Sequence, residues 1–174
     1  MRSPPHNVTM FAAVVLVISL LTQMDAGEGA DACPAPFFMI GEGCYYYSET
    51  FMTWQEARAT CKNLLPEEDA DLVVMDTYCD DFLKIESYAI SNGLKSFWVG
   101  AAKVNLQDYW SWVDGRPVDL TGHYWKAGYP TIANDENCAY VSSTGEFVLR
   151  VRLYNDVCYD IWPFLCQLGV QALE

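Results

Sequence analysis

Basic residues are scarce in this chain of 174 residues, which holds 10 lysine and arginine residues against 23 aspartate and glutamate residues. The formal net charge is therefore −13. Nucleic acids and anionic membranes bind proteins mainly through lysine and arginine. The acidic balance argues against both as partners, and it suits cation binding or plain solubility.

Histidine is nearly absent as well, and no Cys-x-x-Cys pair occurs, so a zinc site is not expected. After removal of the N-terminal segment discussed next, His123 is the one histidine left in the chain. A small secreted hydrolase would need a nucleophile beside a base, and the sequence offers no Ser-His-Asp pattern. We therefore expect no enzymatic activity.

Long apolar runs are limited to one, from Met10 to Leu21, which follows Arg2 and is interrupted only by Ser19. Its 12 residues are too few to span a bilayer as a helix but suit the core of a signal peptide. The sequence predicts a signal peptide over residues 1–26, cleavage after Ala26, and a secreted, extracellular chain without a membrane span. The Asn7-Val8-Thr9 sequon lies inside the removed segment, so no N-glycan is expected.

Cysteine, by contrast, is well represented. Seven cysteines follow the apolar run: Cys33, Cys44, Cys61, Cys79, Cys138, Cys158 and Cys166. In a secreted chain such a set indicates a disulfide framework with one cysteine left over. Six paired cysteines allow 15 connectivities, and the sequence alone does not choose among them.

The first helix carries a recognisable start signal. Strand-like runs at residues 37–40 and 44–47, joined by a glycine turn, precede it. Thr53 and Glu56 form a capping-box pattern, and Pro66 ends the helix. One face of this helix carries Trp54, Ala57, Cys61 and Leu64 at helical spacing.

A second helix is predicted from Asp76 or Thr77 to Ser91, with Gly93 as its stop. Its apolar face would carry Cys79, Phe82, Leu83 and Ile90, which makes Cys79 a buried free thiol; an intermolecular bridge is the alternative. Further strands are predicted at residues 72–75, 97–101, 138–141, 147–154 and 163–166. Residues 102–137 lack sustained periodicity, and so long an irregular stretch is often functional.

Oxygen donors gather beside two cysteines in the last third of the chain. Glu136 precedes Cys138, and the pair Asn155 and Asp156 precedes Cys158. If these two cysteines are bridged, the donor groups come to one place. Carboxylate and amide oxygens gathered at one spot are the ligands that Ca²⁺ prefers.

Taken together, these motifs resemble the long form of the C-type lectin-like domain, and most of all the secreted single-domain lectins of invertebrates. The resemblance covers Cys33 to about Leu168, within a domain predicted over residues 27–174. Its markers are the Cys33/Cys44 pair, the helix ending near Cys61, Trp98-Val99-Gly100-Ala101, Trp125-x-x-Gly128-x-Pro130, Glu136-Asn137-Cys138, Asn155-Asp156 before Cys158, and Phe164-Leu165-Cys166.

The resemblance implies an α+β fold with two helices flanking small antiparallel sheets and a long ligand-binding loop. It also implies three disulfides, Cys33–Cys44, Cys61–Cys166 and Cys138–Cys158, with Cys79 unpaired. In sugar-binding members of the family, one Ca²⁺ is held by a Glu-Pro-Asn or Gln-Pro-Asp triplet, a later Glu, and an Asn-Asp pair. The later Glu corresponds to Glu136, and the pair corresponds to Asn155 and Asp156.

The triplet position departs from the family pattern, since Tyr129, Pro130 and Thr131 stand there. Pro130 keeps the cis bend expected of the loop, but a phenol and a hydroxyl replace the two ligands beside it. One weak Ca²⁺ site is therefore implied, at Glu136, Asn155 and Asp156. The implied carbohydrate contacts are these three residues together with residues 129–131.

The function implied by the resemblance is recognition of microbial surface glycans by a secreted, calcium-dependent lectin in innate immunity. The alternative is a lectin-like module that binds protein, mineral or ice through the same loop without calcium. A third interpretation makes the loop a relic stabilised by local hydrogen bonds. Tyr129 and Trp125 are candidates for stacking on a sugar, although Trp125 fits the loop core better. Assembly into a homo-oligomer stays open.

The secreted chain is expected to begin at Gly27, because cleavage after Ala26 follows the short apolar run. N-terminal sequencing of the secreted protein checks this. A secreted chain that still carries Met10–Leu21 would contradict it.

Overall fold

The computed structural model describes residues 33–103, 109–132, 137–143 and 150–171. All described elements lie in the unit that extends from Cys33 to Glu174. The predicted signal peptide, residues 1–26, and the predicted ligand Glu136 lie outside the described residues. None of the described helices is long and apolar enough to cross a membrane.

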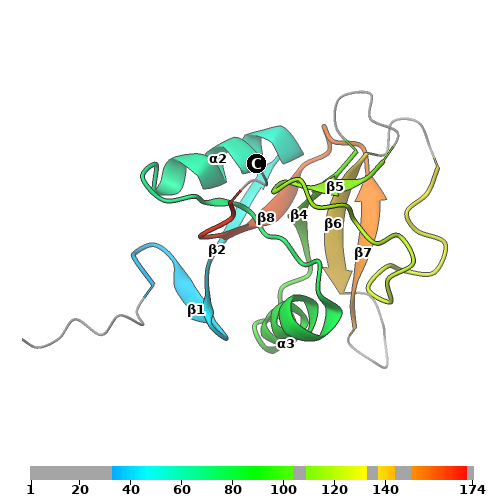
Figure 1. The fold of residues 1–174 in the computed structure, drawn as a ribbon, viewed down its shortest axis with the longest axis horizontal. Helices are drawn as coiled ribbons and strands as arrows, with labels where there is room; N and C mark the ends of the chain where they lie inside the picture. Colours follow the sequence, from blue (N-terminus) through cyan, green and yellow to red (C-terminus); the bar gives the residue numbers. More distant parts are fainter. Residues whose placement is uncertain (1–32, 104–108, 133–136, 144–149, 172–174) are drawn as a thin grey trace, which may run out of the picture. The chain divides into compact units, whose positions relative to one another are not determined.

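The fold is α+β, as predicted, with two α-helices and a mixed sheet. The elements are β1 (Phe38–Ile40), β2 (Gly43–Met52), α2 (Trp54–Leu64), β3 (Asp71–Leu72), a π-helical turn η1 (Tyr78–Phe82), α3 (Leu83–Ser91), β4 (Ser96–Ala102), β5 (Ser111–Trp112), β6 (Cys138–Ser143), β7 (Val151–Asp156) and β8 (Trp162–Gln167). Strands follow the order β1-β2-β8-β4-β6-β7, with β3 paired to β8 and β5 paired to β4. Figure 1 shows α2 on one side of the sheet and α3 on the other.

Helix α2 begins at the predicted capping box. The Thr53 hydroxyl accepts from the Glu56 N–H, and the Glu56 carboxylate accepts from the Thr53 N–H at 3.0 Å. Trp54, Ala57 and Cys61 are buried on one face of the helix. This face packs on Trp98 and on the last strand, so the predicted apolar face is confirmed for these three residues.

The second helix differs from its prediction. The Thr77 carbonyl accepts from the Phe82 N–H, five residues on, which widens the first turn into η1. The residues buried in this segment are Phe82, Ile85 and Ala89. Cys79 is exposed, so its prediction as a buried thiol is wrong. The wide turn changes the rotation of side chains about the axis, which a uniform helical spacing does not anticipate.

The strand predicted at residues 72–75 is shorter in the structure, since β3 covers only Asp71–Leu72. The chain then passes close to the central strand: the Gly100 N–H donates to the Val73 carbonyl at 2.8 Å. A Cβ at Gly100 would lie 2.8 Å from the Leu72 carbonyl oxygen. The glycine therefore permits a close backbone approach that any side chain would block.

The core has two parts, one on each face of the sheet. On one face, α2 covers Trp98, Phe164 and the Cys61–Cys166 bridge. On the other face, α3 packs on Phe97 and Val99, together with aromatic residues of the long loop. Two indoles donate hydrogen bonds at this face: Trp54 of α2 to the Val99 carbonyl of β4, and Trp98 of β4 to the Met52 carbonyl of β2, both at 2.8 Å.

Three disulfides fasten this frame: Cys33–Cys44, Cys61–Cys166 and Cys138–Cys158. This is the pairing that the family resemblance implies. The second joins α2 to β8 across 105 residues of sequence. In the chain-entropy model such a loop stabilises the fold by roughly 4–5 kcal/mol.

The long loop is held to the frame by a partly exposed arginine that contacts two aspartates. Arg116 contacts Asp114, with 2.6 Å between Nη2 and Oδ2, and also contacts Asp76. Asp114 is almost fully buried. Because Asp76 lies two residues before η1, this arginine connects the middle of the loop to the segment between β3 and η1.

Replacing Thr53 with alanine should lower the free energy of unfolding by about 1 kcal/mol, because the Glu56 N–H loses its cap. Thr53→Ser keeps a capping hydroxyl and should lose much less. Urea denaturation of both variants measures the difference. Equal losses in the two variants would show that the hydroxyl does not carry the effect.

Candidate functional site

The segment Trp125–Thr131 lies along β7, at the far edge of the sheet from β1. The Lys126 N–H donates to the Leu153 carbonyl at 3.0 Å, and the Leu153 N–H donates to the Tyr124 carbonyl at 2.8 Å. Gly128 then turns the chain with a φ of +88°. These bonds set the loop directly beside the strand that carries Asn155 and Asp156.

Trp125 belongs to the loop core, as its sequence context favoured. Its side chain is buried, and its indole N–H donates to the Asp119 carbonyl at 3.1 Å. Neighbouring Tyr124 donates its hydroxyl to the same carbonyl, and burial, with a smaller contribution from Asp119, raises the pKa of Tyr124 to about 12. Trp125 therefore offers no free ring face to a sugar.

The peptide bond between Tyr129 and Pro130 is cis, as predicted. Tyr129 is half-buried, and its ring packs edge-on against Tyr154 of β7 with 4.8 Å between centroids. This contact fixes Tyr129 against the sheet, at the position where the family resemblance implies a metal ligand.

Asn155 and Thr131 form a clasp, by which we mean three hydrogen bonds between these two residues. The Thr131 N–H donates to Asn155 Oδ1 at 2.7 Å. Asn155 Nδ2 donates to the Thr131 carbonyl at 3.2 Å and to its hydroxyl at 3.1 Å. Asn155 is only 4% exposed, so the clasp is a buried connection between the loop and β7.

Asp156 ends β7 and pairs with Cys138 of β6. Its Oδ1 accepts from the Val157 N–H at 2.9 Å. Burial raises the pKa of Asp156, and the nearby Asp160 carboxylate adds to the rise, while the Val157 N–H and the Trp162 indole oppose it. Two carboxylates thus lie together at this edge of the sheet.

The predicted site residues are therefore brought together in part. Tyr129, Pro130, Thr131, Asn155 and Asp156 meet where the loop crosses the end of β7. The Cys138–Cys158 bridge joins β6 to the turn after β7, as the family resemblance implies. Glu136, two residues before Cys138, is outside the described residues.

The donors suit Ca²⁺ in kind, because Asn155 and Asp156 supply amide and carboxylate oxygens. Two observations oppose a strong site. Asn155 Oδ1 already accepts from Thr131, and the Tyr129 side chain packs on Tyr154. In the described part of the chain, no three histidine, cysteine, aspartate or glutamate side chains lie close enough to hold a metal ion.

A row of aromatic side chains continues from the site across the sheet, and the sequence did not single it out. Tyr154 stacks on Tyr140 with 5.4 Å between centroids, and Tyr140 stacks on Trp162 at 5.2 Å. The signal was present in the strand alternation, since Tyr140 and Tyr154 are direct partners across β6 and β7. Because each ring lies against the next, the row braces the site.

The lectin C-type domain model matches residues 50–168 of the chain. Among curated proteins, the CD209 antigen of Symphalangus syndactylus is 32% identical over 115 residues, which are 65% of this chain and 28% of that protein. The hepatic lectin of Gallus gallus is 30% identical over 60% of this chain and 47% of its own length. The chain thus spans less than half the length of these two relatives.

Solved structures share the fold. The carbohydrate-recognition domain of the mouse scavenger receptor C-type lectin superposes with a TM-score of 0.63 at 25% identity, covering 82% of this chain and 100% of that one. The C-type lectin domain of murine dendritic cell inhibitory receptor 2, in complex with N-glycan, has a TM-score of 0.60 at 20% identity over 79% and 99% of the two chains. A calcium-independent type II antifreeze protein also has a TM-score of 0.60, at 22% identity over 78% and 93%.

Replacing Asn155 with alanine should release the loop from β7. We expect a loss of about 1–2 kcal/mol in the free energy of unfolding, because three hydrogen bonds are removed. Hydrogen exchange at the Thr131 N–H should also accelerate.

Asn63→Ala is the matched control, since Asn63 is exposed and bonds only within its own helix; its effect should stay within about 0.5 kcal/mol. Denaturant titration and amide exchange by NMR provide the measurements. Unchanged exchange at Thr131 in Asn155→Ala would show that the clasp does not hold the loop.

Proposed function

This chain belongs to the lectin C-type domain family, a non-enzymatic family, and from that premise we propose that it is a secreted lectin recognising glycans on microbial surfaces. The observation that carries the proposal is the site geometry. A loop with a cis proline is set against the end of β7, beside Asn155 and Asp156. Similar domains include one solved with an N-glycan and one described as a carbohydrate-recognition domain.

Secretion is part of the same proposal. It is supported by the apolar run Met10–Leu21, proposed as the core of a signal peptide over residues 1–26, and by the seven cysteines. Residues 27–174 then form the lectin domain, which acts in pattern recognition outside the cell. The acidic charge of the chain leaves nucleic acid out of the proposed partners.

We propose that Glu136, Asn155 and Asp156 bind one calcium ion weakly. When bound, the ion would offer coordination positions to vicinal sugar hydroxyls. Its affinity should be low, because Tyr129 and Thr131 replace two usual ligands and because Asn155 Oδ1 must share its lone pairs with the Thr131 N–H. We expect a dissociation constant on the order of 10⁻⁴–10⁻³ M, in the range of extracellular modules.

A second candidate function is binding of a non-sugar surface, such as a protein, through the same loop and without calcium. The clasp favours it, because Asn155 and Thr131 fix the loop on β7 by hydrogen bonds alone. The two candidates differ in whether recognition needs a cation.

Glycan-array binding with calcium and with chelator separates them. We expect binding that is broad, depends on millimolar calcium and favours polyvalent display, where avidity compensates weak single sites. Asp156→Ala should abolish the calcium-dependent part, whereas Asp80→Ala, an exposed carboxylate beside Cys79, should not change it.

The double substitution Tyr129→Glu with Thr131→Asn should tighten calcium binding and shift preference toward mannose-type sugars. Calorimetry with calcium measures the first effect, and the array measures the second. Array binding that is indifferent to chelator and to Asp156→Ala would remove calcium from the mechanism. Absence of any sugar binding would favour the second candidate.

A further inference from the structure

Strand β2 has an open edge. It lies at the other end of the sheet from β7 and the candidate site at Asn155 and Asp156. Strand β1 pairs only with Gly43–Tyr45, and Tyr45 has a partner on each side, Phe38 in β1 and Gln167 in β8. From Tyr46 to Met52, no strand in the described part of the chain lies on the β1 side of β2. An unpaired strand edge is a ready surface for another chain.

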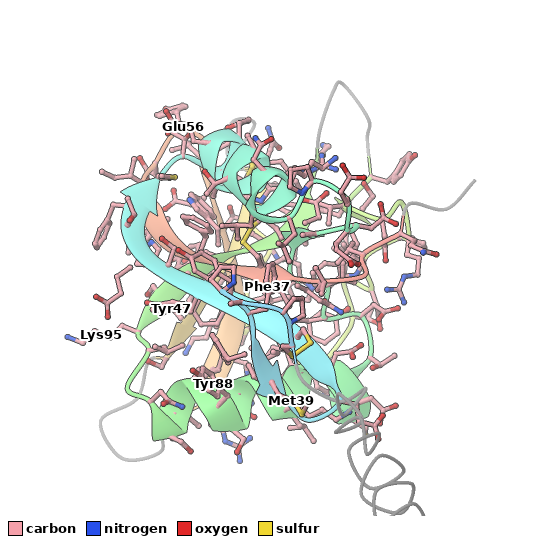
Figure 2. The ribbon with its side chains drawn as sticks, turned by 90° about the vertical axis from the view of Figure 1, so that its left-hand side faces the viewer. Phe37, Met39, Tyr47, Glu56, Tyr88 and Lys95 are labelled. Carbon is pink, nitrogen blue, oxygen red and sulfur yellow. A yellow bond between two sulfur atoms is a disulfide. The ribbon has the colours of Figure 1, made fainter. Side chains whose placement is uncertain are left out.

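A groove of about 500 Å³ lies next to the same strand, where side chains of β2 face the start of β8 and the turn that leads into β4. Its apolar lining includes Tyr47, Phe51, Leu94 and Pro163, and its charged lining residues are Glu49 and Lys95. Phe51 is 59% exposed, which is unusual for a phenylalanine on a strand. Figure 2 faces this side of the molecule, where β2 crosses the view with Tyr47 and Lys95 labelled beside it.

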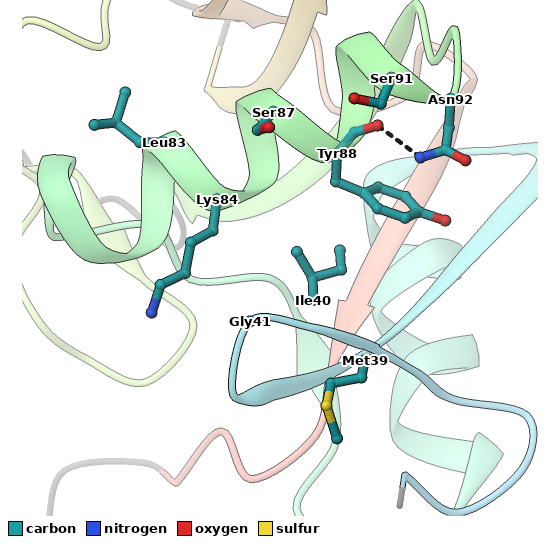
Figure 3. A pocket seen from close by; sticks show the side chains of 9 residues that line it. All are labelled: Met39, Ile40, Gly41, Leu83, Lys84, Ser87, Tyr88, Ser91 and Asn92. Atoms are coloured by element: carbon teal, nitrogen blue, oxygen red, sulfur yellow. Dashed lines mark hydrogen bonds between the residues drawn. The ribbon is translucent and has the colours of Figure 1, made fainter.

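A second hollow, of about 550 Å³, continues the groove along α3. It lies between the β1–β2 turn and the helix, with Met39, Leu83 and Lys84 among its lining residues (Figure 3). The two hollows share Asn92, whose side chain donates to the Tyr88 carbonyl at 2.9 Å. Exposed Met39 and Leu83 add to the apolar character of this side.

We propose that the open edge of β2 and its groove are the interface of a symmetric dimer, formed with a second copy of this chain. A two-fold interface must be complementary to itself. This patch meets the requirement, because it carries both a protruding side chain, Phe51, and an apolar recess beside it. It also carries one charge of each sign, Glu49 and Lys95.

Charge selects a second copy at this place. The chain as a whole has a net charge of −13, so most contacts between two copies would be repulsive. The groove carries one acid and one base, so the repulsion between two copies is smaller there than at the acidic parts of the surface. Across the two-fold axis, Phe51 enters the partner's groove, and Glu49 faces the partner's Lys95.

Side chains carry most of this contact. The Thr50 N–H already donates to Ser48 Oγ at 3.2 Å, and the pairing of β2 with β8 is irregular between Ser48 and Met52. A continuous ladder of backbone hydrogen bonds between the two β2 strands is therefore not required. The seated Phe51 pair is the anchor, as buried aromatic residues are in most interfaces.

Sedimentation equilibrium of the full secreted chain tests the dimer, in a Cys79→Ser background so that the exposed thiol cannot crosslink two copies. We expect a concentration-dependent mass that approaches twice the monomer mass. Phe51→Glu should raise the dimer dissociation constant by at least about tenfold, the loss typical of an aromatic anchor. Leu120→Glu is the matched control, because Leu120 is a comparably exposed apolar residue outside the groove.

A charge exchange supplies an independent check. Glu49→Lys and Lys95→Glu should each weaken the dimer, and the double variant should restore it, because the pair forms between copies. A monomeric wild-type chain, or a Phe51→Glu dimer as strong as the wild type, would overturn the proposal. A double variant as weak as the single variants would overturn the assigned charge contact. None of these outcomes depends on sugar or calcium binding.

Discussion

The fold depends on β8. This strand is the last in the sequence, and yet it pairs with three others. It runs antiparallel to β2 and β3 and contacts β4 in parallel, with Phe164 opposite Trp98. The first helix covers it, and the Cys61–Cys166 bridge holds that contact. The sheet cannot be completed until residues far apart in sequence meet, which makes long-range closure the central constraint. A bridge across that closure stabilises the step that is entropically most demanding.

The candidate site uses the other end of the same sheet. The frame supplies β6 and β7, joined by Cys138–Cys158, and the aromatic row from Trp162 to Tyr154 connects this pair to β8. The loop is then fixed locally by the clasp and by the contact of Tyr129 with Tyr154. Hydrogen bonds and ring packing thus hold this loop on β7.

Much of this frame could be predicted from the sequence, because its signals are local or covalent. The capping box at Thr53 and the strand around Trp98 depend on neighbours within a few residues. The disulfide pairing came from the family resemblance and not from the residues themselves. Cys79 was predicted to be buried, and this was wrong. It lies in the wide turn η1, which rotates its residues relative to those of α3, and the hydrophobic spacing of the sequence does not reveal such a turn. The hydrogen bonds between Asn155 and Thr131 were also not predicted, because 24 residues separate the two and only the folded sheet brings them together.

The arrangement of the bridges also decides how the chain responds to a protease. A cut between Cys61 and Cys166 leaves two pieces joined through the long bridge, and a cut between Cys33 and Cys44 is spanned by the first bridge. Between Cys33 and Cys166, the stretch from Cys44 to Cys61, which holds most of β2 and α2, is the part with no bridge across it. A nick in the binding loop would therefore change the size of the protein only after reduction, whereas a nick in β2 would release the N-terminal hairpin. After a cut in this stretch, the two pieces would be held together only by non-covalent contacts, among them the pairing of β2 with β8.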